Sequence, residues 1–288
     1  MTRLNVKKTY KLFIGGKFPR TESGRYYSLE GKSGEVIANL CLASRKDVRN
    51  TIVAARKAQP GWASATAYNR GQVMYRLAEM LETRRASFIE EMVTLGLTKG
   101  KAEKEVDASV DRLVYYAGWC DKYSALFSSV NPTASAHLNF SVHEPTGVVA
   151  AVAPEESPLL GLVSVLAPAI AGGNSVMVLV SHRFAPTAIS FAEVVQNSDV
   201  PGGVVNVLSG EADELVPQFL SHMDINAVVL ARPNVAVDVL KEATGNIKRM
   251  VKWTSNWDRE NPYMILDLQE VKTTWHPFQT SASGGGGY

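Results

Sequence analysis

The chain has 288 residues, 45% of them hydrophobic and 20% charged, which is typical of a globular protein with a sizeable core. Its 30 basic and 28 acidic residues give a formal net charge of +2 and are spread along the sequence, which argues against nucleic acids and anionic membranes as partners. No apolar run approaches the roughly 20 residues of a membrane helix, and the cysteines and histidines show no disulfide or metal-ligand spacing. We therefore expect a cytoplasmic protein without a metal site.

The first 130 residues are predicted to be mostly helical. Apolar residues recur at helical spacing in residues 46–59, 66–95 and 101–127. Pro60 and Gly61 are expected to end the first of these helices. The helices are amphipathic, so each should cover another part of the fold.

From residue 147 onward the pattern changes to short, fully apolar runs separated by helical stretches. The apolar runs are residues 148–153, 176–180, 204–208 and 227–231, and the helical patterns between them lie at about 158–171, 186–198 and 211–221. Strands that are apolar on both faces and alternate with helices indicate a parallel sheet covered on both sides. The prediction is a doubly wound, Rossmann-like α/β domain. Neither GxGxxG after the first run nor GxxxxGK[ST] occurs, so a scaffold without a retained ligand stays open.

Three segments resemble the framework motifs of the aldehyde dehydrogenase superfamily, in the same order and at similar spacing. They are residues 143–149 (HEPTGVV), 166–176 (LAPAIAGGNSV) and 201–207 (PGGVVNV), and residues 12–17 (LFIGGK) are similar to the N-terminal motif. The resemblance covers about residues 1–250. It implies a nucleotide-binding domain, a catalytic domain and a small sheet that joins subunits, with aldehyde oxidised through a cysteine thioester and NAD or NADP as hydride acceptor.

Where the family has an oxyanion-binding asparagine in a Pro-Trp-Asn-x-Pro turn, residues 154–158 read PEESP. Glu156 would stand in place of the amide donor and would repel a developing oxyanion. The alternative, that Glu156 is a relocated general base, competes with the plainer interpretation of an acidic surface turn.

The family's coenzyme contacts are also altered. Its Lys-Pro-Ser-Glu segment, which binds the adenosine ribose, is replaced by residues that run from Val180 to Arg183. Arg183 either faces a 2'-phosphate, as arginines do in NADP-binding proteins, or is a solvated side chain. Arg232 stands where a glycine lets the pyrophosphate approach, although Pro233 could still begin a helix. With Gly210, these positions form a degenerate coenzyme site, so NAD or NADP binding is expected to be weak or absent.

The base motif Glu-Leu-Gly-Gly-Lys and the nucleophile motif Gly-Gln-x-Cys of the family do not occur. Cys41 and Cys120 lie in apolar periodic segments, far N-terminal of any nucleophile position, and are interpreted as buried small hydrophobes. The resemblance therefore implies that the catalytic domain and its nucleophile are missing and that no residue can be assigned a catalytic role.

Residues 269–277 (QEVKTTWHP) resemble the family's C-terminal arm strand, which pairs with the hairpin equivalent to residues 131–150. The expected oligomerisation positions alternate with polar residues in two strands: Leu138, Phe140, Val142, Val271, Thr273 and Trp275. The predicted organisation is a Rossmann-like domain (1–130 and 151–250), an arm (131–150 and 268–278) and a flexible tail (279–288). A chance β-rich tail is the alternative to the arm.

These features favour a non-catalytic structural or regulatory subunit that docks on a full-length aldehyde dehydrogenase or on itself by strand addition. The chain resembles the second, cysteine-less module of fused two-module family members. An NAD(P)-dependent oxidoreductase, with residual activity or a site completed by a partner chain, is the main alternative. A nucleotide-sensing module is a third.

Overall fold

The fold is built on a five-stranded parallel sheet with the order β10-β9-β6-β7-β8. The computed structural model describes residues 6–31, 34–233 and 237–278. The strands are β6 (Val148–Val152), β7 (Ser175–Leu179), β8 (Val205–Leu208), β9 (Ala227–Leu230) and β10 (Arg249–Lys252). This confirms the predicted doubly wound α/β class. The fifth strand was not predicted, and the expected domain boundary at residue 250 falls inside it.

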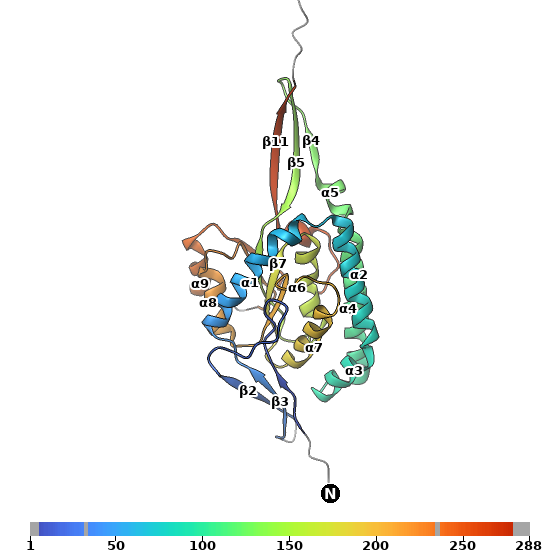
Figure 1. Cartoon of the computed structure of the whole chain (residues 1–288), viewed down its shortest axis with the longest axis vertical. Coiled ribbons are helices and arrows are strands. Elements are labelled where there is room, and N and C mark those ends of the chain that lie inside the picture. Colours follow the sequence, from blue (N-terminus) through green and yellow to red (C-terminus); the bar gives the residue numbers. More distant parts are fainter. Residues whose placement is uncertain (1–5, 32–33, 234–236, 279–288) are drawn as a thin grey trace, which may run out of the picture.

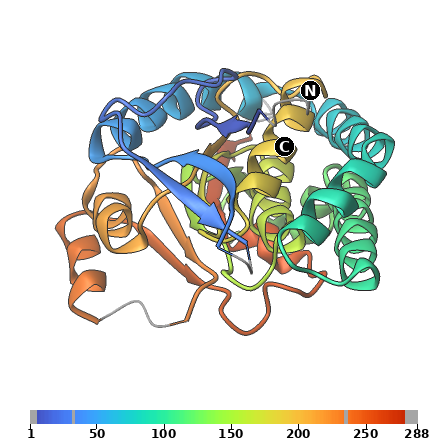
Figure 2. The same cartoon turned by 90° about the horizontal axis from the view of Figure 1, so that it is seen from below.

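Helices cover both faces of this sheet (Figures 1 and 2). Alternate residues of each strand point to opposite faces, so two separate hydrophobic clusters form. One cluster includes α1 (Arg45–Ser64) and α8 (Ala212–Ser221), and the other includes α6 (Leu160–Ala171) and α7 (Ala185–Gln196). Behind α6 and α7 lie α2 (Ala67–Thr83), α3 (Arg85–Thr94) and α4 (Lys99–Trp119). Burial on both faces explains why β6 to β9 are apolar except for Ser175 and Asn206, and the buried amide of Asn206 donates to the carbonyls of Val176 and Gly203.

The N-terminal part is mostly helical from Arg45 to Phe127, as predicted, and it also contains a small sheet that was not predicted. The strands β1 (Thr9–Tyr10), β2 (Tyr26–Glu30) and β3 (Val36–Cys41) have the order β1-β3-β2. Beside it, the backbone of Phe13 pairs with that of Val207 and covers the outer edge of β8. Gly16 lies so close to Gly202 that an added Cβ would come within 2.9 Å of its Cα, which explains the paired glycines of two distant motifs.

Each of the three predicted N-terminal helices differs from the observed structure in at least one boundary. α1 does not end at Pro60 but continues to Ser64, because Trp62 is buried and its indole N–H donates to the carbonyl of Ile170 at 2.9 Å. This tertiary contact outweighs the hydrogen bond that proline cannot make. The helix expected at 66–95 is two helices that meet at Arg84, and the one expected at 101–127 divides into α4 and α5 (Lys122–Phe127). None of the described helices is long and apolar enough to cross a membrane.

A three-stranded antiparallel arm projects from the α/β body (Figure 1). It consists of β4 (Ser129–Asn131), β5 (His137–Pro145) and β11 (Gln269–Pro277), in the order β11-β5-β4. The buried side chain of Asn174 fixes its base, since its amide oxygen accepts the N–H of Gly147 and its amide nitrogen donates to Leu268. The expected pairing of the two arm segments is thus present, whereas the tail at 279–288 lies outside the described residues.

The connection from β10 to β11 packs against the body. Between β9 and β10 lie α9 (Val237–Leu240) and a 3-10 turn (Lys241–Gly245), and between β10 and β11 lies the short helix α10 (Tyr263–Leu266). Arg112 of α4, only 4% exposed, donates to the carbonyls of Trp257 and Asp258 and to the hydroxyl of Ser164. Tyr116 donates to the carbonyl of Asn261 at 3.1 Å. The segment that joins the sheet to the arm is therefore anchored by buried polar contacts.

We predict that Arg112→Ala lowers the free energy of unfolding by about 3 kcal/mol, because it leaves buried backbone carbonyls without a donor. Urea denaturation measures this. The matched control Arg76→Ala, which removes an exposed i,i+3 ion pair on α2, should change stability by less than about 0.5 kcal/mol. Equal effects of the two substitutions would show that the connection is not anchored through Arg112.

Candidate functional site

The crevice at the carboxyl edge of the sheet is the candidate site. The chain leaves β6 toward β7 on one side and later returns to place β9 on the other, so the strand order reverses between β6 and β9. In open α/β sheets, ligands bind outside the carboxyl ends of the strands at such a switch point. The residues that follow β6, β7 and β9 therefore decide what this crevice can hold.

Arg232, which follows β9, occupies the switch point. Its Nε donates to the carbonyl of Ala153 at 2.6 Å, and its Nη2 donates to the carbonyl of Val180 at 2.7 Å. Its Nη1 lies 2.9 Å from a carboxylate oxygen of Glu155. Burial lowers the pKa of Arg232 from its usual value, and Glu155 opposes this shift. One guanidinium thus joins the carboxyl ends of three strands.

Glu155 connects the same loops from the other side. Its carboxylate accepts from the hydroxyl of Ser181 at 2.9 Å and from the backbone N–H of Arg183 at 3.2 Å. Ser181 in turn accepts from the N–H of Phe184, and its neighbour His182 stacks on Tyr27 with ring centroids 4.0 Å apart. The carboxylate of Glu155 therefore accepts the hydrogen bonds of Ser181 and Arg183 that an anionic ligand in the crevice would otherwise accept.

These residues do not fit a dinucleotide. The pyrophosphate position at the switch point is filled by the side chain of Arg232, and Val180 is only 1% exposed and carries no polar group. The expectation that Pro233 begins a helix falls at the edge of the described residues, and the first helix described after it is α9 (Val237–Leu240). At Gly210 an added Cβ would come within 2.8 Å of Leu215, so this glycine serves packing.

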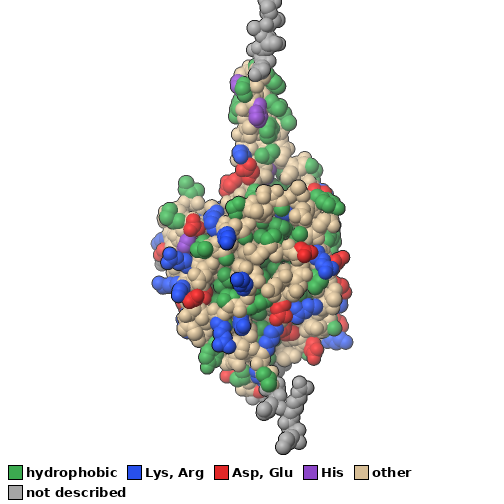
Figure 3. Space-filling view, in the orientation of Figure 1, with side chains coloured by type: hydrophobic (Ala, Val, Ile, Leu, Met, Phe, Trp, Pro, Cys, Tyr) green, Lys and Arg blue, Asp and Glu red, His purple; other side chains and the backbone are tan. Residues whose placement is uncertain are grey.

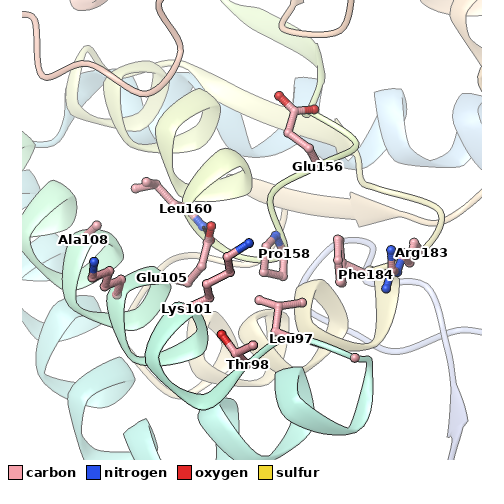
Figure 4. Close-up of a pocket in the computed structure, with 12 residues that line it drawn as sticks. Leu97, Thr98, Lys101, Glu105, Ala108, Glu156, Pro158, Leu160, Arg183 and Phe184 are labelled. Carbon is pink, nitrogen blue, oxygen red and sulfur yellow. Dashed lines mark hydrogen bonds between the residues drawn. The ribbon is translucent and has the colours of Figure 1, made fainter.

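Glu156 and Arg183 line a separate cavity of about 590 Å³ next to the crevice (Figure 4). The cavity is bounded by the first turns of α4, the start of α6 and the loop after β7. Its polar side chains include Lys101 and Lys104 of α4, which the sequence had not singled out. The structure therefore divides the predicted site residues: Arg232 donates to the carbonyl of Val180 in the crevice, whereas Glu156 and Arg183 line different parts of the cavity (Figure 4).

Both cysteines are buried and free, at 5% exposure for Cys41 and 1% for Cys120. Burial raises the pKa of Cys120 to about 12, and its thiol contacts Met74 and the carbonyl of Tyr116. Neither thiol lies in the crevice. The described residues contain no group of three or more histidine, cysteine or acidic side chains that could hold a metal ion.

In the arm, the six expected oligomerisation residues lie on opposite faces of the sheet. The register pairs Thr273 with Ser141 and Trp275 with Asn139, whereas Phe140 faces Thr274. Val271, Thr273 and Trp275 therefore share one face, and Leu138, Phe140 and Val142 share the other. The first face also carries hydrogen bonds that link Asn131, Ser141 and Thr273.

Sequence reasoning missed Glu155, Ser181 and Tyr27, which hold the crevice closed. One signal could have found Glu155. An arginine placed after a core strand needs an acidic partner when it is buried, and the adjacent pair Glu155 and Glu156 follows the neighbouring strand. The choice between the two carboxylates required the geometry.

The parallel sheet, with a crevice at its carboxyl edge, defines a doubly wound α/β domain of the nucleotide-binding type. A separate three-stranded arm is attached to it. The family model for the aldehyde dehydrogenase family matches residues 18–280, and the chain belongs to this family. The predicted family resemblance is thereby confirmed.

Similar proteins share both sequence and fold with this chain. Mouse cytosolic 10-formyltetrahydrofolate dehydrogenase is 30% identical over 260 residues, which are 86% of this chain and 28% of that protein. The putative aldehyde dehydrogenase DhaS of Bacillus subtilis is 27% identical, over 93% of this chain and 54% of that protein. The NAD+ complex of an aldehyde dehydrogenase from Bacillus cereus superposes with a TM-score of 0.80 at 25% identity, over 85% of this chain and 50% of that one. The chain spans about half, or less, of the length of these relatives.

We predict that neither cysteine reacts readily in the native protein. With a pKa of about 12, the thiolate fraction of Cys120 near pH 8 is roughly a thousandfold below that of a free cysteine. A chromogenic thiol reagent should label both thiols only after unfolding, while an added cysteine at the exposed Ala134 should react at once. Rapid labelling of Cys41 or Cys120 in the folded chain would contradict their assignment as inert core residues.

Proposed function

We propose that this chain is a non-catalytic member of the aldehyde dehydrogenase family that acts as a structural or regulatory subunit of a larger assembly. Its partner would be a full-length aldehyde dehydrogenase, with a second copy of the chain as the alternative. The observation that carries the proposal is a fully formed, exposed arm attached to a domain whose nucleotide crevice is filled by its own Arg232.

The exposed apolar surface of the arm supports association. Val130 is 75% exposed, Val271 61%, Trp275 58% and Leu138 40%. Hydrophobic side chains are visible along the projecting arm in the space-filling view (Figure 3). In the described residues, the nine-residue strand β11 pairs only with β5, so its outer edge presents unpaired backbone groups. An edge of this length with an apolar surface is a liability unless another chain covers it.

The chemistry available at the crevice supports a non-catalytic role. Oxidation through a cysteine thioester requires an accessible thiolate and donors for an oxyanion. The two cysteines of the sequence are buried away from the crevice. Burial also raises the pKa of the Cys120 thiol to about 12. Glu156 contributes a carboxylate where a donor is needed. The two free thiols also suit the cytoplasmic location that we propose.

The direct test is purification of the tagged chain from its native host, followed by native mass determination. We predict a stoichiometric complex with a full-length aldehyde dehydrogenase. Trp275→Glu should reduce recovery of the partner at least tenfold, because it places a charge on the exposed arm face. Tyr68→Glu is the matched control, since Tyr68 is 71% exposed on α2.

Two outcomes would count against the proposal. A wild-type chain recovered as a monomer would remove the need for a partner. Equal recovery of the partner with Trp275→Glu and Tyr68→Glu would show that the arm is not the docking surface.

A further inference from the structure

A second cavity lies on the outer face of the small N-terminal sheet, whose strands β2 and β3 are at the end of the body opposite the arm (Figure 1). Its volume is about 440 Å³, within the range of small-molecule sites. The strand register pairs Thr9 with Asn39 and Tyr26 with Cys41, so these four lining residues share one face of the sheet. The opposite face packs into the hydrophobic core. The cavity shares no lining residue with the crevice that Arg232 fills.

The loop from β1 to β2, which forms the other wall of this cavity, is held in place by a buried carboxylate. Asp47 of α1 is 1% exposed, and it accepts from the hydroxyl of Thr21 at 2.6 Å and from the backbone N–H of Glu22 at 3.0 Å. Arg20 and Arg25 lie on either side of this anchored segment, and both line the cavity. The two arginines are therefore carried by a fixed part of the backbone, which lowers the entropy that a ligand would lose on binding.

One of these arginines is free to bind an anion, and the other is not. Arg25 is engaged by Glu214, because its Nη1 and Nη2 lie 3.0 Å and 2.8 Å from the two carboxylate oxygens. Within the described part of the chain, Arg20 forms no ion pair or hydrogen bond. None of the described side chains that line the cavity is acidic. One uncompensated guanidinium favours a ligand with a single negative charge, and its planar fork matches the geometry of a carboxylate.

Tyr26 adds a planar apolar surface beside this charge. Its side chain is 70% exposed, and its ring contacts no other aromatic ring or cation among the described residues. Aromatic rings prefer offset-stacked or edge-to-face contacts with other rings, so the free face of Tyr26 favours a planar aromatic ligand over an aliphatic one.

The floor of the cavity is polar. The amide oxygen of Asn39 accepts from the hydroxyl of Ser28 at 2.8 Å, which leaves the two amide hydrogens as donors. The hydroxyl of Thr9 has no hydrogen-bond partner in the described part of the chain. The cavity thus combines one anion-binding group, one ring surface and polar groups that can bind a hydroxyl.

We propose that this cavity binds a planar aromatic monocarboxylate. The carboxylate pairs with Arg20, the aromatic ring stacks on Tyr26, and Thr9 and Asn39 bind a hydroxyl group on the ring. A charge-assisted, bidentate contact of this kind is stronger than a neutral hydrogen bond. The site goes beyond the proposed subunit role and does not depend on it, because each of these residues belongs to the chain itself.

Calorimetric titration of the purified full chain with 4-hydroxybenzoate tests this proposal. We expect saturable binding with a dissociation constant of about 1 mM or below. The uncharged 4-hydroxybenzamide lacks the carboxylate, and cyclohexanecarboxylate lacks the planar ring. Each should bind more weakly by about fivefold or more, because each loses one of the two main contacts.

Two substitutions separate the contributions of the charge and the ring. Arg20→Gln should weaken binding of 4-hydroxybenzoate by about tenfold or more, because it removes the charged fork. Tyr26→Leu should reduce the preference for 4-hydroxybenzoate over cyclohexanecarboxylate to less than about twofold, because it removes the stacking surface. Both side chains are exposed, so the thermal unfolding midpoint should stay unchanged in both variants.

Arg49→Gln and Tyr68→Leu are the matched controls. Arg49 is an exposed arginine of α1 that has no ion pair among the described residues, Tyr68 is 71% exposed on α2, and neither lines the cavity. Each control should change binding by less than about twofold, as expected for a screened surface position. Equal loss in the two arginine variants, equal affinity for 4-hydroxybenzamide, or no saturation up to about 10 mM would each overturn the proposal.

Discussion

The contact between Arg232 and the carboxyl ends of β6 and β7 determines what the crevice of this protein can bind. A doubly wound sheet leaves backbone carbonyls and a switch-point crevice at this edge, and a bound ligand ordinarily completes them. Here the guanidinium donates to Ala153 and Val180, while Glu155 neutralises it and holds Ser181 and Arg183. A largely buried charge is tolerated only when it is paired and hydrogen-bonded, and the guanidinium of Arg232, whose side chain is 15% exposed, is both. The crevice is thus complete without a ligand.

The same principle appears on the other side of the body. Arg112 is buried beneath the connection between β10 and β11 and donates to its carbonyls, while Tyr116 donates to Asn261. These contacts fix the short path by which the chain leaves the sheet and enters the arm. Asn174 then sets the base of the arm against the body. Buried Arg112 and Asn174 therefore hold the α/β domain and the arm together, in a chain that spans about half, or less, of the length of its relatives.

Much of this fold could be predicted from the sequence, because four largely apolar segments separated by helices permit few arrangements. β10 escaped prediction since its residues are only half buried, and the helix that continues through Pro60 depends on the distant carbonyl of Ile170. For the candidate site, the sequence predicted only which positions differ from the family's coenzyme-binding and oxyanion-binding motifs. That Arg232 turns inward to the strand ends, that Glu155 rather than Glu156 pairs with it, and that the arm residues divide between two faces all depend on three-dimensional register.

The central claim is that the nucleotide crevice is filled by the chain itself. Its most direct test is calorimetric titration of the purified protein with NAD+ and NADP+, alongside a full-length family member as a positive control. The account predicts no saturable binding of either dinucleotide to this chain up to about 1 mM, under conditions in which the control binds. Saturable binding of NAD+ or NADP+ to the wild-type chain would contradict it, because Arg232 would then have to leave Ala153 and Val180 to admit the pyrophosphate.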